Sequence, residues 1–404
     1  MTVSTAQVTA EPAGKFPKID RFIVSVSLLG MALLASLIWL ETAPFLVGLF
    51  FVGALLGIAL YHGAFGFTAG WRNWVVSGNG TGLRAQLFLL GLACLLIVPV
   101  VSGGIEGTAG TIAPVGVSLV VGSFLFGFGM QLGGGCGSGT LFTVGAGNLR
   151  MVLTLVFFIF GSVIGTLHLP FWLDAPGTDP IQLAASLGPW GAIALQWAVL
   201  AGLWWLIGRR EKRMTGKTSH GLLERDRSVS VVRTLLTGRW PFLWAAVVLA
   251  VGNLLTVILS GTPWGVTFAF ALWGAKIAQF IGFDMTQVEF WTWDYGALAL
   301  RDSLLVNVPS VMNFGLLLGA MLAAGMANKY NAGSQNPLVW RSVLAAVIGG
   351  SLMGYGARLG FGCNIGAMFS GIASASVHGW IWFASAFVGS LLGIKARPHF
   401  GLGN

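Results

Sequence analysis

Long apolar runs with almost no charges recur along the whole chain, and they constrain the fold more than any other feature. An α-helix needs about 20 apolar residues to cross the ~30 Å hydrocarbon core of a bilayer. Runs of suitable length occupy residues 22–40, 44–61, 85–101, 115–133, 151–169, 190–207, 241–259, 264–281, 303–326, 342–360 and 380–394. The sequence therefore predicts an all-α, polytopic membrane protein of eleven spans.

Composition excludes most other classes of protein. Only 9% of the residues are charged, whereas an average soluble domain has about 25%. With 13 acidic and 22 basic residues, a soluble fold of this length could not cover its surface with charge. Nucleic-acid binding is excluded for the same reason, although the net charge is +9.

The positive charge is concentrated in one polar segment. Residues 209–239 contain nine Lys or Arg and three acidic residues, and segments rich in Lys and Arg stay on the cytoplasmic side of a membrane. The predicted organisation is a polar cytoplasmic N-terminus (1–21), a first membrane half (22–208), a basic cytoplasmic loop (209–239), a second half (240–396) and a tail (397–404). The same distribution of charge predicts a cytoplasmic N-terminus.

Two positive charges near the C-terminus conflict with a count of eleven spans. An odd number of crossings places Lys395 and Arg397 on the outside, against the positive-inside tendency. Either one span is miscounted, or a short tail with two positive charges is tolerated there.

The chain also contains an internal repeat. Residues 122–147 align without gaps on 349–374, so the offset is 227 residues. Matched pairs include Cys136/Cys363 and six glycine pairs: Gly122/Gly349, Gly127/Gly354, Gly129/Gly356, Gly133/Gly360, Gly135/Gly362 and Gly139/Gly366. The sequence predicts two pseudo-symmetric repeats. Six spans between equivalent positions would make the repeats parallel, related by an axis along the membrane normal, with a substrate site at their interface.

Both cysteines lie in glycine-rich segments that cannot continue a stable helix, since each glycine costs roughly 1 kcal/mol relative to alanine. We name residues 133–140 the first loop and 360–366 the second loop. Inside a bilayer, irregular backbone is tolerated only where protein or a cavity surrounds it, which predicts inward-pointing, broken or re-entrant helices. The alternative is that the glycines allow close helix packing and the cysteines are small fillers.

Several residues are candidates for a substrate pathway through these loops. Backbone N–H groups at the start of a helix attract anions, and a thiol is a weak hydrogen-bond donor that can hold an anion without trapping it. The candidates are Cys136, Cys363, Gly135, Gly137, Gly362, Asn364 and Arg358. Arg358 would neutralise an anion near Cys363, or it would extend to the membrane interface. The sequence predicts no metal site and no cofactor.

The duplicated pattern GxGxxLGxGCxxG resembles the YeeE/YedE family of bacterial inner-membrane transporters of sulfur compounds, over residues 44–394. The resemblance implies uptake of thiosulfate or a related sulfur anion, with Cys136 and Cys363 contacting the substrate as it passes. The family often delivers sulfur to a small cytosolic carrier protein resembling SirA or TusA. The family pattern has a further cysteine near the N-terminus, where this chain has Gly66 within 63–67.

Two functions follow as hypotheses. The first is membrane transport of a small sulfur-containing anion, most plainly thiosulfate, by a protein that is not an enzyme and has no nucleotide-binding motif. The second is a membrane thiol sulfurtransferase, which accepts sulfur as a persulfide and passes it to a cytosolic acceptor. They differ in whether a cysteine is chemically modified during turnover.

Overall fold

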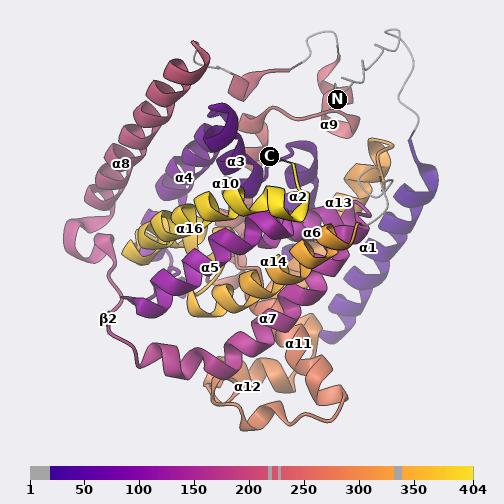
Figure 1. The fold of residues 1–404 in the computed structure, drawn as a ribbon. Coiled ribbons are helices and arrows are strands. Elements are labelled where there is room, and N and C mark those ends of the chain that lie inside the picture. Colours follow the sequence, from indigo (N-terminus) through magenta and orange to yellow (C-terminus); the bar gives the residue numbers. More distant parts are fainter. Residues whose placement is uncertain (1–18, 217–220, 226–228, 332–338, 404) are drawn as a thin grey trace.

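The fold is described from a computed structural model that places residues 19–216, 221–225, 229–331 and 339–403. Its long helices are α1 (Arg21–Glu41), α2 (Pro44–His62), α4 (Thr81–Pro99), α5 (Val117–Gly133), α7 (Leu149–Leu173), α8 (Leu183–Thr215), α10 (Phe242–Ser260), α13 (Val308–Met326), α14 (Trp340–Leu359) and α16 (Val377–Ala396). Shorter helices are α3 (Phe67–Ser77), α6 (Gly137–Gly145), α9 (Val231–Thr237), α11 (Thr267–Phe280), α12 (Asp294–Arg301) and α15 (Ser370–Ala373). The predicted all-α membrane fold is confirmed (Figure 1).

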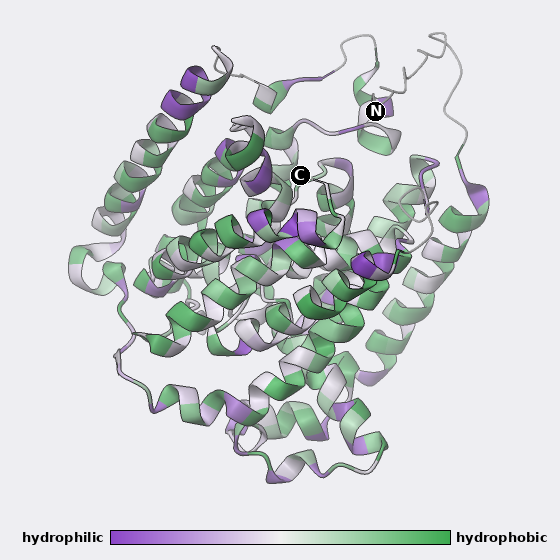
Figure 2. Cartoon of the chain, in the orientation of Figure 1, coloured by the Kyte–Doolittle hydropathy of each residue, from purple (hydrophilic) through white to green (hydrophobic). Residues whose placement is uncertain are grey.

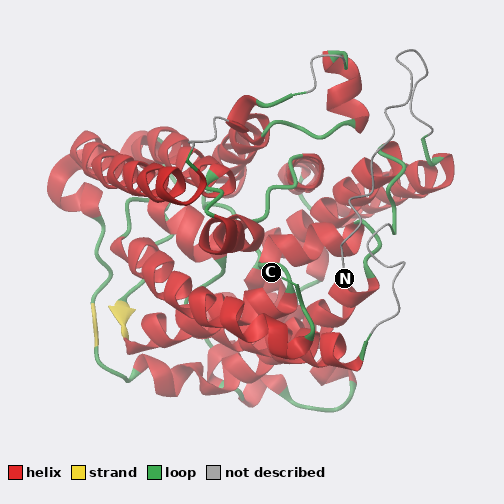
Figure 3. Cartoon of the chain, turned by 45° about the horizontal axis from the view of Figure 1, so that its top comes forward, coloured by secondary structure: helices red, strands yellow, loops and turns green. Residues whose placement is uncertain are grey.

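Non-α structure is confined to short segments. The π-helical turns are η1 (Val100–Gly104) and η7 (Asn364–Phe369). The 3-10 turns are η2 (Gly221–Leu223), η3 (Met285–Gln287), η4 (Glu289–Trp291), η5 (Leu304–Val306) and η8 (Arg397–Phe400). Two-residue strands β1 (Val115–Gly116) and β2 (Gly177–Thr178) pair antiparallel at one edge of the molecule (Figure 3).

Ten helical segments of the described residues are long and apolar enough to cross a membrane. The predicted span at 264–281 is wrong: Pro263 to Val266 is irregular, and α11 has only 14 residues. At 1.5 Å per residue α11 is about 21 Å long, too short for the ~30 Å core. An even number of crossings puts Arg397 on the same side as Arg21, which removes the conflict over the positive tail.

Two ends of the molecule are named here by the short helices they carry, the α9 face and the α12 face (Figure 1). The helices α1 and α8 lie on opposite flanks of the bundle and are its least buried spans. Figure 2 shows both as apolar over most of their length, with hydrophilic residues gathered at their ends. Their apolar sides therefore suit contact with lipid.

The two repeats run in opposite directions. Ser118, at the start of α5, donates a hydrogen bond to the carbonyl of Leu359 at the end of α14 (2.9 Å). Likewise, the Trp240 N–H, just before α10, donates to the carbonyl of His62 at the end of α2 (2.9 Å). Repeat-equivalent helices are thus antiparallel, so the pseudo-twofold axis lies in the membrane plane. The expectation of parallel repeats is wrong, because counting α11 as a crossing changed the parity.

Several repeat glycines outside the two loops serve close packing between helices. A Cβ on Gly127 would lie 1.9 Å from the Ala386 carbonyl oxygen of α16, and one on Gly354 would lie 2.2 Å from the Phe158 oxygen of α7. The backbones of α5 and α14 also meet, since a Cβ on Gly349 would lie 2.3 Å from the Gly133 nitrogen. These glycines hold the two repeats together.

The Gly354→Ala variant is expected to lower the thermal unfolding temperature in detergent. Its methyl group must push α14 away from α7, and such overpacking costs about 1–3 kcal/mol. Gly202→Ala on α8 is the matched control: nothing lies within 4 Å of its Cβ position, so improved helix propensity should leave the unfolding temperature unchanged or raised. Equal unfolding temperatures for Gly354→Ala and the parent protein would contradict this packing.

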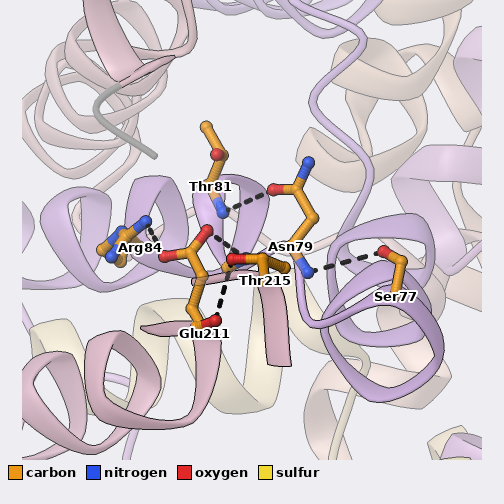
Figure 4. Close-up of polar contacts among 7 residues, drawn as sticks. Ser77, Asn79, Thr81, Arg84, Glu211 and Thr215 are labelled. Carbon is orange, nitrogen blue, oxygen red and sulfur yellow. Dashed lines mark hydrogen bonds and ion pairs between the residues drawn. The ribbon is translucent and has the colours of Figure 1, made fainter. Parts of the chain in front are cut away.

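A buried ion pair attaches α8 to the bundle near the α9 face. Arg84 of α4 pairs with Glu211 of α8, and the Gly80 N–H donates to the same carboxylate (3.3 Å) (Figure 4). The Thr215 hydroxyl donates to the Glu211 carbonyl (2.9 Å). Part of the predicted basic loop is thus the end of α8, whereas its residues 217–220 and 226–228 lie outside the described residues.

Candidate functional site

The thiols of Cys136 and Cys363 occupy the same structural position in the two repeats. Each cysteine is the N-cap of a helix, with extended backbone angles before α6 and before η7. The Cys136 sulfur accepts a hydrogen bond from the Gly139 N–H, and the Cys363 sulfur accepts one from the Ile365 N–H, both at 3.4 Å. Both side chains are buried. The sequence places thiols here because Cys, like Ser, can satisfy an otherwise unpaired N–H at a helix start.

The two loops meet inside the bundle. A Cβ on Gly137, the first residue of α6, would lie 3.0 Å from the Cys363 sulfur and 3.4 Å from the Thr267 methyl carbon. The start of α6, the second thiol and the start of α11 therefore share one small space. Only glycine leaves room for the Cys363 sulfur beside residue 137.

Two other predicted glycines shape the loops. A Cβ on Gly135 would lie 3.0 Å from Met151 and 3.1 Å from the Thr140 nitrogen. Gly362 has a φ of +146°, and a Cβ there would lie 2.8 Å from the Ala367 nitrogen. Gly362 therefore cannot be replaced without a shift of the backbone, whereas a side chain at Gly135 requires its neighbours to move by a few tenths of an ångström.

Arg358 reaches the loop junction and does not extend to the membrane interface. The residue is 7% exposed, in the last turn of α14, and its Nη2 donates to the Thr267 hydroxyl (3.0 Å). Among the described residues it forms no ion pair, and its Nε has no hydrogen-bond partner. An arginine buried in a membrane span is costly, and an anion beside it would offset that cost.

Asn364 is also buried at the junction, directly after Cys363. Within the described part of the chain, neither its side-chain oxygen nor its nitrogen has a hydrogen-bond partner. Buried polar atoms normally find partners. Among the described residues, the junction thus holds two unsatisfied donor groups next to one thiol, on Arg358 at the end of α14 and on Asn364 in the second loop.

A cavity of about 380 Å³ opens at the α12 face and ends at the second loop. Its lining includes Arg358, Gly362 and Gly366, with Thr267 of α11 and Tyr295 of α12. A second cavity of about 660 Å³ opens at the α9 face, lined in part by Phe65, Gly66, Gln86 and Arg239. The inverted repeats thus place one cavity at each end, with the two thiols buried between the ends.

Sequence reasoning missed the residues that hold the irregular segments before α3 and α11. Asn313 of α13 donates to the Val266 carbonyl (3.0 Å), and Gln86 of α4 donates to the Phe67 carbonyl (3.5 Å). Gln86 and Asn313 differ by 227 in number, which is the repeat offset. Extending the repeat alignment towards the N-terminus would have found them.

Cys94 lies apart from the two loops. It is buried on α4, and its thiol donates to the Ile372 carbonyl of α15 (3.5 Å). The three cysteines are all free thiols. Cys94 satisfies a carbonyl at a helix contact, which is a packing role.

Comparison with known proteins agrees with the predicted resemblance. Residues 62–392 match the family described as sulphur transport. Two proteins named thiosulfate transporter TsuA align over most of their length: that of Escherichia coli is 24% identical over 83% of this chain and 90% of TsuA, and that of Spirochaeta thermophila is 27% identical over 82% and 92%. The probable transporter YedE of Escherichia coli is 34% identical, but the match covers only 38% of this chain and 37% of YedE. The family match covers most of the chain, from the end of α2 into α16 and including both loops, and on this evidence the chain belongs to the sulphur transport family.

Proposed function

We propose that this protein imports a small sulfur-containing anion, thiosulfate in the first instance, through a pathway that passes both loops. The observation that carries the proposal is the meeting of two buried thiols and two helix starts at one point, beside a buried arginine that forms no ion pair within the described part of the chain. Two aligned relatives carry the name thiosulfate transporter. The match to YedE covers little of that protein, so it supports transport but not the choice of substrate.

In the proposed pathway, the anion enters the cavity at the α12 face and reaches Arg358 and Asn364, whose free donors replace its hydration. The anion then passes from Cys363 to Cys136, two sites whose weak S–H donors allow release. The glycines at 135, 137 and 362 keep the backbone close to the anion's path. On this path Arg358 comes before the thiols, so the anion meets a positive charge as it enters the buried part of the passage.

Uptake of radiolabelled thiosulfate tests this function. Cells that lack other sulfur importers should accumulate the label with this chain and show only background without it. Purified protein in liposomes should release trapped thiosulfate down its gradient, because no cytosolic acceptor is needed for passage alone. Sulfate, an anion of similar size, is the matched control. Equal rates of release of sulfate and thiosulfate would contradict a pathway selective for thiosulfate.

The proposed location is the bacterial inner membrane, with the N-terminus, the α9 face and the basic segment 209–239 cytoplasmic. On this scheme the halves 22–208 and 240–396 flank a cytoplasmic loop. The cavity at the α9 face would then release the anion to the cytosol, where a small SirA/TusA-like carrier protein could accept its sulfur. Arg239 and Asn79 in that cavity suit contact with an anion or an acidic partner surface.

Two single cysteines test the orientation. Val232 of α9 and Phe283, which follows α11, are both strongly exposed, at 62% and 65%, on opposite faces. An impermeant maleimide is expected to label Phe283→Cys in intact spheroplasts and Val232→Cys only after the membrane is opened. The buried native thiols give a low background. The reverse pattern would refute a cytoplasmic N-terminus.

A further inference from the structure

Phe361, in the second loop, has a backbone conformation that is unfavourable for its side chain. Its φ is +57°, in the left-handed region, which costs a residue other than glycine roughly 1–2 kcal/mol. The repeat-equivalent position in the first loop is Gly134, with a φ of +95°. The turn thus requires positive φ in both repeats, yet only the first repeat uses glycine.

The position of the Phe361 side chain points to a function for this unfavourable backbone conformation. Phe361 is half-buried and lines the cavity at the α12 face together with Arg358 and Gly362. Cys363, two residues further on, is fully buried and is not among the residues that line the cavity. Phe361 also packs against the main hydrophobic core. The ring therefore lies where the cavity ends and the buried thiol begins.

The first loop differs at the matching place. Gly134 is exposed, and a Cβ there would lie 2.7 Å from Nη1 of Arg150. That arginine is fixed by hydrogen bonds to the carbonyls of Leu132 (2.6 Å) and Gly133 (2.8 Å). One repeat thus has a polar, charged group over its loop, whereas the other has an aromatic ring.

We propose that the Phe361 side chain is a size filter between the α12-face cavity and Cys363, and that it determines which sulfur anions reach the thiol. The inference rests on the proposed pathway through Cys363. Strained backbone conformations persist where the surroundings impose them, and they cluster at functional sites. On this proposal the ring moves aside for a compact anion and excludes a bulky one.

Thiol reactivity tests the filter without measuring transport. A full-length chain with Cys94→Ala and Cys136→Ala leaves Cys363 as its one thiol. The probe is 2-sulfonatoethyl methanethiosulfonate, an anionic reagent larger than thiosulfate, added to purified protein in detergent. Phe361→Gly removes the ring and suits the positive φ, so we expect Cys363 to react at least tenfold faster than with Phe361 present.

Two further variants separate a filter from general loosening. Phe361→Leu keeps an apolar side chain of similar bulk and should react within threefold of the parent rate. Trp293→Ala removes a larger aromatic side chain from the same cavity, outside the second loop, and should react within twofold. The proposal is overturned if Phe361→Gly reacts no faster than the parent while the unfolded chain reacts completely, or if Trp293→Ala matches Phe361→Gly.

The second measurement is inhibition of uptake, and it uses the protein with its three native cysteines retained. Benzenethiosulfonate, a bulky thiosulfonate anion, should inhibit thiosulfate uptake at least tenfold more strongly in Phe361→Gly than in the parent. Unchanged inhibition would contradict a size filter. The reactivity of Cys363 is measured without transport. If the protein does not carry thiosulfate, the reactivity of Cys363 still tests the size filter, so failure of the transport proposal can be distinguished from failure of the filter proposal.

Discussion

Replacing either Cys136 or Cys363 by alanine is expected to lower the initial rate of thiosulfate uptake at least tenfold. Both thiols are buried at helix starts. Loss of one hydrogen bond to a charged group costs about 1.5–3 kcal/mol, and 1.4 kcal/mol is a factor of ten. The rate should be measured over the first seconds of uptake, at equal amounts of protein in the membrane.

Cys94→Ala is the matched control, because this thiol is equally buried but lies at a packing contact with α15. Its uptake should stay within twofold of the parent. If Cys136→Ala and Cys363→Ala both transport normally, the loops serve only close packing. If Cys94→Ala is as impaired as the other two, the pathway includes a third thiol that the loop geometry does not identify.

Serine variants at the two positions separate passage from covalent sulfur transfer. A hydroxyl is a stronger but more hydrated donor, so a pathway that needs only hydrogen bonds should keep part of its uptake in at least one serine variant. A persulfide carrier requires the sulfur nucleophile, and serine would then be as inactive as alanine. Intact-protein mass gives the second readout: a gain of one sulfur atom that forms and disappears at the rate of uptake would favour the carrier.

Most of the fold could be predicted from the sequence because membrane spans are long and uniformly apolar. The predicted span at 264–281 was wrong for a simple reason. Hydropathy records only composition, but Pro263 and Gly265 lie in irregular backbone and the helix begins only at Thr267. Because this segment was counted as a span, the repeats were predicted to be parallel, whereas they are antiparallel. Length of regular helix, not hydropathy alone, decides whether a segment crosses the bilayer.

The candidate site could be predicted in part, and the part that could not depends on contacts between distant segments. The repeat identified Cys136 and Cys363, since a cysteine matched in two glycine-rich loops is not explained by apolar composition. Thr267 could not be found in this way, because its contact with Arg358 joins α11 to α14. Phe361 gave no sequence signal, since its importance comes from a backbone angle.

Arg358 provides the other large expected effect, because its guanidinium brings a positive charge to the loop junction. Its repeat equivalent, Gln131, donates to the Thr68 carbonyl (3.2 Å) as Arg358 donates to Thr267. Arg358→Gln therefore places in the second repeat the side chain that the first repeat already accommodates. This substitution removes the charge while keeping a hydrogen-bond donor on a shorter side chain.

We expect Arg358→Gln to lower thiosulfate uptake at low substrate concentration by at least tenfold, because a charge-assisted hydrogen bond to the anion is lost. Arg358→Lys keeps the charge without the planar fork and should retain more activity than the glutamine variant. Arg301→Gln, at an exposed ion pair with Asp302, controls for loss of positive charge on the chain and should transport within twofold of the parent. The decisive measurement is the dependence of initial rate on thiosulfate concentration: a raised KM at equal protein level assigns Arg358 to anion binding. Normal KM with a lowered unfolding temperature would instead assign it to holding α11 through Thr267.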